Sequence, residues 1–278
     1  MMSETIYIAT VHWPVNKWID IQQYYLNQNI TTAFKNFAVV APGTDTGSAR
    51  FEYVNRSGKK DHAGHLNHLL LKVLETAKSD NDILIFLDGD AFPIAPLDTY
   101  LENKLADYQL IAVQRPENYG EHLPHPCFCA ARISCWKELG AVWGKAKSSS
   151  EFGNDPGGRM LETLNQKSII WGKILRSNKL DIHPLFFGIY DDVIYHHGAG
   201  FRDPISRIEM AGSEMIRKQR KLLSQIAEHL PNRFFLDWKR RLSPYRREEY
   251  RIIRKNQELQ DDVFSKLKRD KEFYRILI

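Results

Sequence analysis

The spacing of apolar residues along the chain predicts alternating strands and helices. Short apolar runs bounded by turn-forming residues predict strands at residues 5–11, 37–40, 83–87, 110–113, 128–133 and 192–196. Apolar residues at helical spacing predict helices at residues 18–28, 63–78, 136–143 and 159–166. Two polar, glycine-containing stretches, residues 44–60 and 147–158, are predicted to be loops. This order indicates an α/β fold with a mainly parallel sheet flanked by helices, followed beyond Pro204 by a basic helical extension.

The strand predicted at residues 83–87 is apolar throughout, which is typical of a strand buried on both faces of a parallel sheet. It ends abruptly in Asp88-Gly89-Asp90. Ligands of open α/β sheets bind beyond the carboxyl ends of the strands, so we expect both carboxylates at the opening of a site. Carboxylate oxygens suit Mg²⁺ or Mn²⁺, which also accept phosphate oxygens as ligands. The alternative is a solvated turn, because Asp and Gly are common where strands end.

A pair of histidines follows the last predicted strand. His196 and His197 precede a glycine-rich bend, where an imidazole could supply a nitrogen ligand to the same ion. Side chains on a strand alternate between its two faces, so only one of the two is expected to reach the ion. The pattern of residues alone leaves open which one does.

Two segments resemble parts of known enzymes. Residues 86–94 resemble the D-x-D strand of GT-A glycosyltransferases. The segment from His197 is similar to the metal motif H-x-x-G-x-x-K-P of family-8 enzymes, and His197, Gly200 and Pro204 match it, while Asp203 stands where the motif has lysine. The likeness, which extends distantly to family-2-like bacterial glycosyltransferases, follows the order of parts from about residue 5 to residue 204. It implies a Rossmann-like GT-A fold and a nucleotide-sugar donor.

The resemblance also implies roles for single residues. Asp88 would touch the donor ribose and the metal, and Asp90 would bind the metal, which would be Mn²⁺ or Mg²⁺. The register of the family-8 motif makes His197 the third protein ligand, with His196 facing away. Arg202 would take over the phosphate contact of the missing lysine.

Further donor contacts are implied at the ends of two elements. In GT-A enzymes the loop after the first strand cups the nucleotide base, and here that loop contains Val11, His12 and Trp13. The helix before the D-x-D strand often contacts the donor, which makes Asn67 a candidate. That helix also carries His62, His65 and His68.

The acceptor side is predicted from the loop at residues 147–158. Inverting GT-A enzymes use a carboxylate in a comparable place to deprotonate the acceptor hydroxyl. Asp155 is the predicted catalytic base and Glu151 the reserve, unless Asp-Pro-Gly is simply a turn. His125 and Pro126 are predicted to border the acceptor pocket.

Composition agrees with a folded enzyme. The 278 residues are 43% hydrophobic and 26% charged, which is ordinary for a globular protein and excludes a disordered chain. No apolar run approaches the roughly 20 residues needed to span a bilayer. The first ten residues lack the basic stretch and cleavage site of a signal peptide, so we expect a cytoplasmic protein.

The three cysteines leave a second metal chemistry open. Cys127, Cys129 and Cys135 are an odd number, which argues against a disulfide framework. Together with His125 they could form a zinc site, but the paired C-x2-C spacing is missing. Small buried thiols are the simpler interpretation.

The charge is divided unevenly along the chain. Residues 215–278 contain 18 Lys/Arg and 9 Asp/Glu, a local charge of +9, whereas residues 1–214 contain 21 and 25, a charge of −4. We therefore divide the chain into a GT-A-like catalytic domain, 1–214, and a basic extension, 215–278. Residues 234–254 mix aromatic and basic side chains, which favours peripheral docking on an anionic inner membrane face, close to a glycan or lipid-linked acceptor. A tail packed on the body with solvated charges is the alternative, and nucleic acid is not expected because no reading motif is present.

Three competing functions use similar features. Haloacid-dehalogenase-like phosphatases also have D-x-D after a buried strand, but their motif opens the domain and continues Gly-Thr or Gly-Val, whereas this one lies beyond residue 80 and continues Ala91-Phe92-Pro93. A metal-dependent nuclease fits poorly, since the basic charge is segregated from the D-x-D body. A non-catalytic GT-A-like scaffold that binds a partner or membrane through its tail is the remaining alternative.

Overall fold

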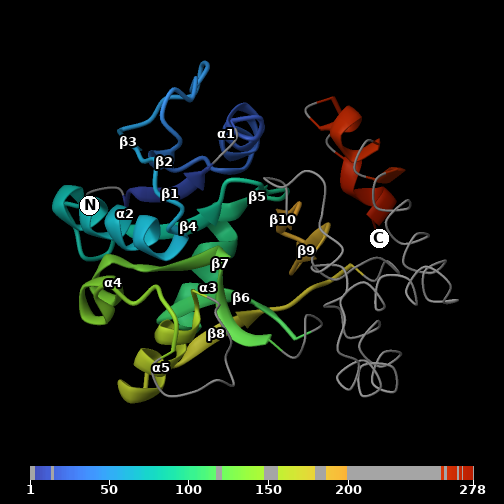
Figure 1. Cartoon of the computed structure of the whole chain (residues 1–278). Helices are drawn as coiled ribbons and strands as arrows, with labels where there is room; N and C mark the ends of the chain where they lie inside the picture. The colour runs from blue at the N-terminus through green and yellow to red at the C-terminus, as the bar shows by residue number, and fades with distance from the viewer. Residues whose placement is uncertain are drawn as a thin grey trace, which may run out of the picture.

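The protein is built around one seven-stranded sheet (Figure 1). The computed structural model describes residues 4–13, 16–116, 121–146, 156–178, 186–198 and, except for 260, 261, 268 and 271, residues 258–277. The strand order is β3-β2-β1-β4-β7-β6-β8. The bounds are β1 (Ile6–His12), β2 (Phe34–Val40), β3 (Tyr53–Arg56), β4 (Ile83–Asp88), β6 (Leu110–Arg115), β7 (Glu121–Arg132) and β8 (Trp171–Ile174). Only β7 runs antiparallel to its neighbours, so the predicted mainly parallel α/β sheet is confirmed.

Helices cover both faces of this sheet. Apolar side chains of α2 (His62–Thr76), α4 (Ile133–Leu139) and α5 (Gly158–Gln166) share one core with the sheet. Apolar side chains of α1 (Ile19–Asn29) and α3 (Leu97–Asp107) share the core on the opposite face. Because both faces are covered, β4 has no solvated side and its five apolar residues are all buried.

The direction of the strand order reverses at β1 and β4. From β1, the chain builds outward through β2 and β3 on one side and through β4 on the other. The parallel register places Val11 beside Asp88 at the carboxyl ends of the two strands. This is the position at which open α/β sheets bind their ligands.

A small antiparallel sheet lies next to this edge. It consists of β5 (Ala91–Pro93), β10 (Ile194–His196) and β9 (Gly188–Tyr190), in that order. The strand β5 follows the Asp88–Asp90 turn directly, and the register pairs His196 with Ala91. The small sheet therefore brings His196 back to the Asp88–Asp90 turn.

The end of the chain packs on the outer face of the small sheet, where Figure 1 shows it in red. Residues 262–266 are helical, and a 3-10 helix follows at Phe273–Leu277. Val263, Leu267, Phe273 and Leu277 are buried in one cluster with residues of α1, β5, β9 and β10. The Phe273 ring centroid lies 4.9 Å from that of Tyr195 and 5.8 Å from that of Tyr25. This described part of the tail is thus part of the folded body, whereas the predicted boundary at residues 214 and 215 lies outside the described residues.

Most long elements agree with the sequence pattern, and most short ones were missed. The strands at 5–11, 37–40, 83–87 and 110–113 and the helix at 63–78 are confirmed with small shifts at their ends. The predicted loop at 44–60 contains β3, the helix predicted at 136–143 begins at Ile133, and β5, α3, β8 and β9 were not predicted. The missed strands β3, β5, β8 and β9 all lie at the edge of a sheet, where few side chains need to be buried. The missed helix α3 has a weak apolar pattern. Within the described residues, no helix is both long and apolar enough to span a bilayer.

We predict that Phe273→Ala destabilises the whole body, although the residue lies close to the end of the chain. The ring is fully buried and contacts aromatic side chains of α1, β5 and β10. Deleting a buried phenylalanine ring costs about 3–5 kcal/mol of unfolding free energy. Urea denaturation monitored by circular dichroism measures the loss. Leu71→Ala, at a side chain that is 52% exposed, is the control; equal stability of the two variants would show that the end of the chain is not docked.

Candidate metal and nucleotide site

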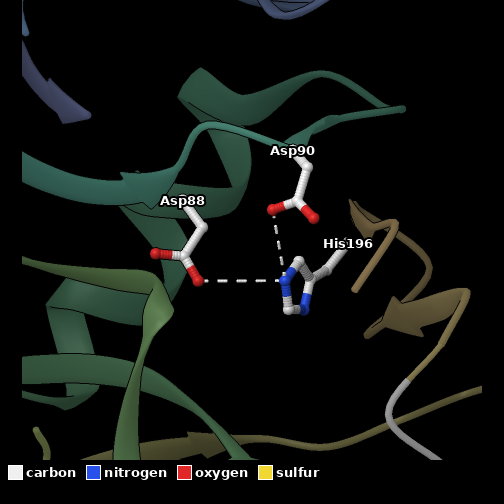
Figure 2. A group of neighbouring side chains, drawn as sticks. All are labelled: Asp88, Asp90 and His196. Carbon is white, nitrogen blue, oxygen red and sulfur yellow. Dashed lines mark ion pairs between the residues drawn. The ribbon is translucent and has the colours of Figure 1, made fainter. Parts of the chain in front are cut away.

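Three side chains converge where β4 ends (Figure 2). Asp88 is the last residue of β4, Asp90 follows in the turn, and His196 ends β10. Nε2 of His196 lies 3.4 Å from Oδ1 of Asp90 and 3.8 Å from Oδ2 of Asp88. Asp90 and His196 are buried, and Asp88 is largely covered. Among the described residues, this is the one group of three or more His, Cys, Asp or Glu side chains whose ligand atoms lie within 4.8 Å of one another.

The backbone of the D-x-D turn is held by a side chain from α1. Nε2 of Gln22 donates hydrogen bonds of 2.8 Å to the carbonyl oxygens of Asp88 and Ala91. Because both amide hydrogens are used, Oε1 of Gln22 accepts, and Nε2 of His12 donates to it over 3.1 Å. The carbonyl of Asp90 accepts from the backbone N–H of His197, which ties the turn to β10. The turn is therefore fixed from both sides before any ligand binds.

The residues fit a divalent cation. Two carboxylates and an imidazole are a donor set for Mn²⁺ or Mg²⁺. Adjacent ligands of an octahedral ion with ~2.1 Å bonds lie roughly 3 Å apart, close to the separations seen here. Oδ1 of Asp88 is buried, and its 3.4 Å contact with Nε2 of His62 does not have hydrogen-bond geometry, so this oxygen can still bind an ion.

The prediction that His197 joins the carboxylates while His196 faces away is wrong in this structure. Alternation along β10 puts His196 on the side of the carboxylates and His197 on the side of the tail. Nδ1 of His197 lies 2.9 Å from the hydroxyl of Tyr195, and its ring packs 4.6 Å from Trp18. Burial lowers the pKa of His197 to about 3, so the ring is neutral. Only one of the two histidines faces the carboxylates, as expected from alternation, but it is His196 and not the His197 that the family-8 motif indicated.

One histidine of α2 reaches the site, and the others do not. Nε2 of His62, at the first position of the helix, lies 3.4 Å from Oδ1 of Asp88. His65 contacts the Lys59 carbonyl and His68 the Tyr53 hydroxyl. The predicted donor contact Asn67 instead uses both ends of its amide to hold the backbone of Trp143. Only its place at the helix start distinguishes His62 in the sequence.

Of the three residues predicted to cup the nucleotide base, Val11 and His12 are buried and Trp13 is half-buried. Val11 is beside Asp88, yet its side chain is buried in the core. The ring of His12 is 1% exposed and supports Gln22, and burial lowers its pKa to about 4. Trp13 packs on the core and donates from its indole nitrogen to the Ser57 carbonyl. His12 therefore supports the Asp88–Asp90 turn indirectly, through its hydrogen bond to Gln22.

Two residues of the β6–β7 hairpin complete the surroundings. His125 on β7 has its ring centroid 5.9 Å from that of His196, and Arg115 ends β6. Both are buried. Burial, with Arg115 and the neighbouring histidines, holds the pKa of His125 well below its usual range. His125 was predicted beside an acceptor pocket, and the structure places it beside the carboxylate cluster.

The remaining predicted residues divide into buried thiols and positions outside the described residues. Cys127, Cys129 and Cys135 are buried and form no disulfide, and burial raises the pKa of Cys129 and Cys135, so the zinc alternative gains no support. Asp155, Glu151 and Arg202 lie outside the described residues, and their roles stay predictions.

Comparison with known proteins gives similarity in structure only. No protein-family model matches the chain, and no curated protein sequence does. A solved structure from Desulfovibrio desulfuricans G20, described as a nucleotide-diphospho-sugar transferase, is 11% identical; the alignment covers 83% of this chain and 100% of that one, with a TM-score of 0.42.

Two further solved structures are similar to the same degree. The mannosyltransferase PcManGT from Pyrobaculum calidifontis, in complex with GDP-Man and Mn²⁺, is 13% identical over 63% of this chain and 57% of that one, with a TM-score of 0.42. The catalytic domain of Drosophila β1,4-galactosyltransferase 7 is 12% identical over 72% and 74%, with a TM-score of 0.39. All three TM-scores are below 0.5.

We predict that His196→Ala lowers Mn²⁺ affinity at least tenfold and that His197→Phe leaves it unchanged. His196 faces both carboxylates, whereas His197 faces Trp18 and Tyr195. Even residues that only support metal ligands cost 10–100-fold when removed, so loss of a direct ligand should cost at least about tenfold. Isothermal titration with MnCl₂ is the measurement, and circular dichroism confirms that both variants fold. The opposite ranking would return the ligand role to His197.

Proposed function

We propose that this chain is a divalent-metal-dependent glycosyltransferase that moves a sugar from a nucleotide-sugar donor to an acceptor hydroxyl. The observation that carries the proposal is the position of Asp88, Asp90 and His196 at the carboxyl ends of β4 and β10, where the strand order reverses beside β1. In this position a nucleotide can lie across the strand ends while its phosphates reach the cluster. The D-x-D resemblance of residues 86–94 supports the same chemistry.

The residues of the cluster divide the work of holding the donor. Asp88, Asp90 and His196 would hold the ion, which would offset the charge developing on the departing nucleoside diphosphate. Gln22 fixes the backbone between the two carboxylates, and His12 fixes Gln22. His62 lies at the outer side of Asp88 and restrains the orientation of that carboxylate. No covalent intermediate on the protein is needed.

The acceptor base remains Asp155, acting in an inverting transfer. The support for this proposed role comes from a described neighbour in sequence: Gly157 packs so tightly on β7 that a Cβ atom would lie 2.1 Å from the Pro124 carbonyl oxygen. Pro124 immediately precedes His125, which lies beside the metal cluster. The chain that follows Asp155 therefore emerges next to the site.

We propose further that the acceptor is a lipid-linked or other cell-surface glycan met at the inner face of an anionic membrane. The support is the charge of +9 in residues 215–278 and the mixture of aromatic and basic residues at 234–241. The apolar residues of the described end of the tail are buried against the body, so the proposed membrane contact rests on the residues before 258.

We predict that the protein binds a nucleoside diphosphate only with Mn²⁺ or Mg²⁺, and that Asp90→Asn abolishes this binding without unfolding the body. Removal of the charge weakens the hold on the ion, while the core packing stays the same. Calorimetric titration of UDP and GDP with Mn²⁺, followed by a nucleotide-sugar hydrolysis screen, tests this. Asp107→Asn, at an exposed carboxylate of α3, is the matched control.

Two outcomes would overturn the proposal. If wild type and Asp90→Asn bind nucleoside diphosphate with equal affinity, Asp90 is not part of the site that binds metal and nucleotide. Release of phosphate from a simple monoester, without cleavage of any nucleotide-sugar, would favour the phosphatase.

We predict that the full chain sediments with vesicles containing phosphatidylserine and that added salt releases it. Reversing three tail charges (Lys239→Glu, Arg240→Glu and Arg241→Glu) should abolish binding, since each basic residue near an anionic surface contributes about 1 kcal/mol. The control reverses three exposed lysines of the body: Lys145, Lys167 and Lys173. Full truncation is unsuitable, because the end of the tail is part of the core. If the full chain does not sediment with anionic vesicles at low salt, the proposed membrane role is wrong.

A further inference from the structure

The strand β7 carries an irregularity beside the metal cluster. Its pairing with β6 is regular as far as Ala112 opposite Cys129, but Val113 then pairs with His125. Residues 126–128 are therefore extra on the β7 side, and the last regular pair with β4 is Leu87 opposite Phe128, one residue before Asp88. Bulges of this kind change the direction of side chains and occur often beside active sites.

The bulge determines which nitrogen of the His125 ring carries the proton. The backbone N–H of Cys127 donates to Nδ1 of His125 over 3.0 Å. A backbone nitrogen can only donate, so Nδ1 is the acceptor and has no hydrogen. In the neutral ring the hydrogen is therefore on Nε2.

The Nε2–H group is a donor in an enclosed place. The side chain of His125 belongs to a residue that is 8% exposed, and its ring lies beside His196. Of the residues that the structure describes, none accepts a hydrogen bond from Nε2. Because no described group takes this hydrogen, the N–H group is available to a bound ligand.

The charges around His125 favour an anionic oxygen as the missing acceptor. The guanidinium of Arg115, which is always charged, acts on His125 electrostatically. The two carboxylates of the cluster would be balanced by the bound divalent ion. A phosphate oxygen completes the charge balance, and charge-assisted hydrogen bonds of this kind are the strong ones.

We propose that His125 binds the donor by donating its Nε2–H hydrogen bond to a phosphate oxygen of the nucleotide-sugar. This rests on the proposed function and adds a donor-binding residue outside the metal cluster. It also removes His125 from consideration as the base: Nδ1 is occupied by the Cys127 N–H and Nε2 already carries a hydrogen, so neither nitrogen can take a proton from an acceptor hydroxyl.

Binding of inorganic pyrophosphate and of UDP or GDP, each with Mn²⁺, tests the proposal. His125→Phe keeps the ring shape but has no donor and should weaken both affinities at least about tenfold, the effect of losing a hydrogen bond to a charged group. His125→Gln, whose amide nitrogen can replace Nε2, should recover most of the affinity. Mn²⁺ affinity measured alone should be the same in all three proteins, which separates this role from that of a metal ligand. His68→Phe, at a histidine that contacts only Tyr53 among the described hydrogen bonds, is the control.

Nitrogen NMR of the histidine rings gives a test independent of any ligand. In ¹⁵N-labelled protein, Nδ1 of His125 should show the shift of an unprotonated nitrogen and Nε2 that of a protonated one. The reverse tautomer would overturn the proposal. So would a His125→Phe variant that binds pyrophosphate like wild type, or one that loses turnover with unchanged affinity. If the wild type itself binds no nucleoside diphosphate with Mn²⁺, the proposed function fails instead, and the tautomer result still stands apart from it.

Discussion

The site depends on the electrostatic cost of placing two carboxylates at the buried end of one strand. Asp90 is almost fully buried and Asp88 largely so, and both face the same small space. Like charges this close are unfavourable unless a cation or hydrogen-bond donors compensate them. The structure supplies imidazoles on two sides, His196 and His62, and leaves Oδ1 of Asp88 without a hydrogen bond. The divalent ion that we propose would resolve the remaining imbalance.

The protein holds this unfavourable arrangement through backbone contacts rather than through the carboxylates themselves. The side-chain amide of Gln22 donates hydrogen bonds to the turn on one side, and the backbone N–H of His197 donates to it on the other. Behind His196, Tyr195 and Phe92 of the small sheet pack on each other and on Phe273 from the end of the chain. The end of the chain is thereby connected to the strand that carries His196 through packing alone. His196 faces the carboxylates, whereas Tyr195 and His197 on either side of it face the aromatic cluster.

The same alternation explains how two adjacent histidines acquire different environments. His196 projects into the charged site, whereas His197 projects into an aromatic cluster in which burial keeps it neutral. His12 and His125 are also buried and have lowered pKa values, yet one holds the scaffold and the other lies beside the site. For these residues, the role follows from which partner the ring nitrogens meet, and residue type alone does not distinguish them.

The sequence by itself determined the α/β class, the buried strand β4 and the place of Asp88 and Asp90 at its end, because an uninterrupted apolar run followed by acids has few other physical solutions. It also showed that only one of two neighbouring histidines could face an ion. Only the tertiary structure decided which one, since the parity of β10 is set by its pairing with β5 and by the packing of Phe264 and Phe273 from the distant tail. The contact of His62 with Asp88, the burial of His12 and the bulge that orients His125 were likewise beyond the sequence pattern. Each depends on contacts between segments far apart in the chain, and local hydrophobic periodicity does not indicate which distant segments meet.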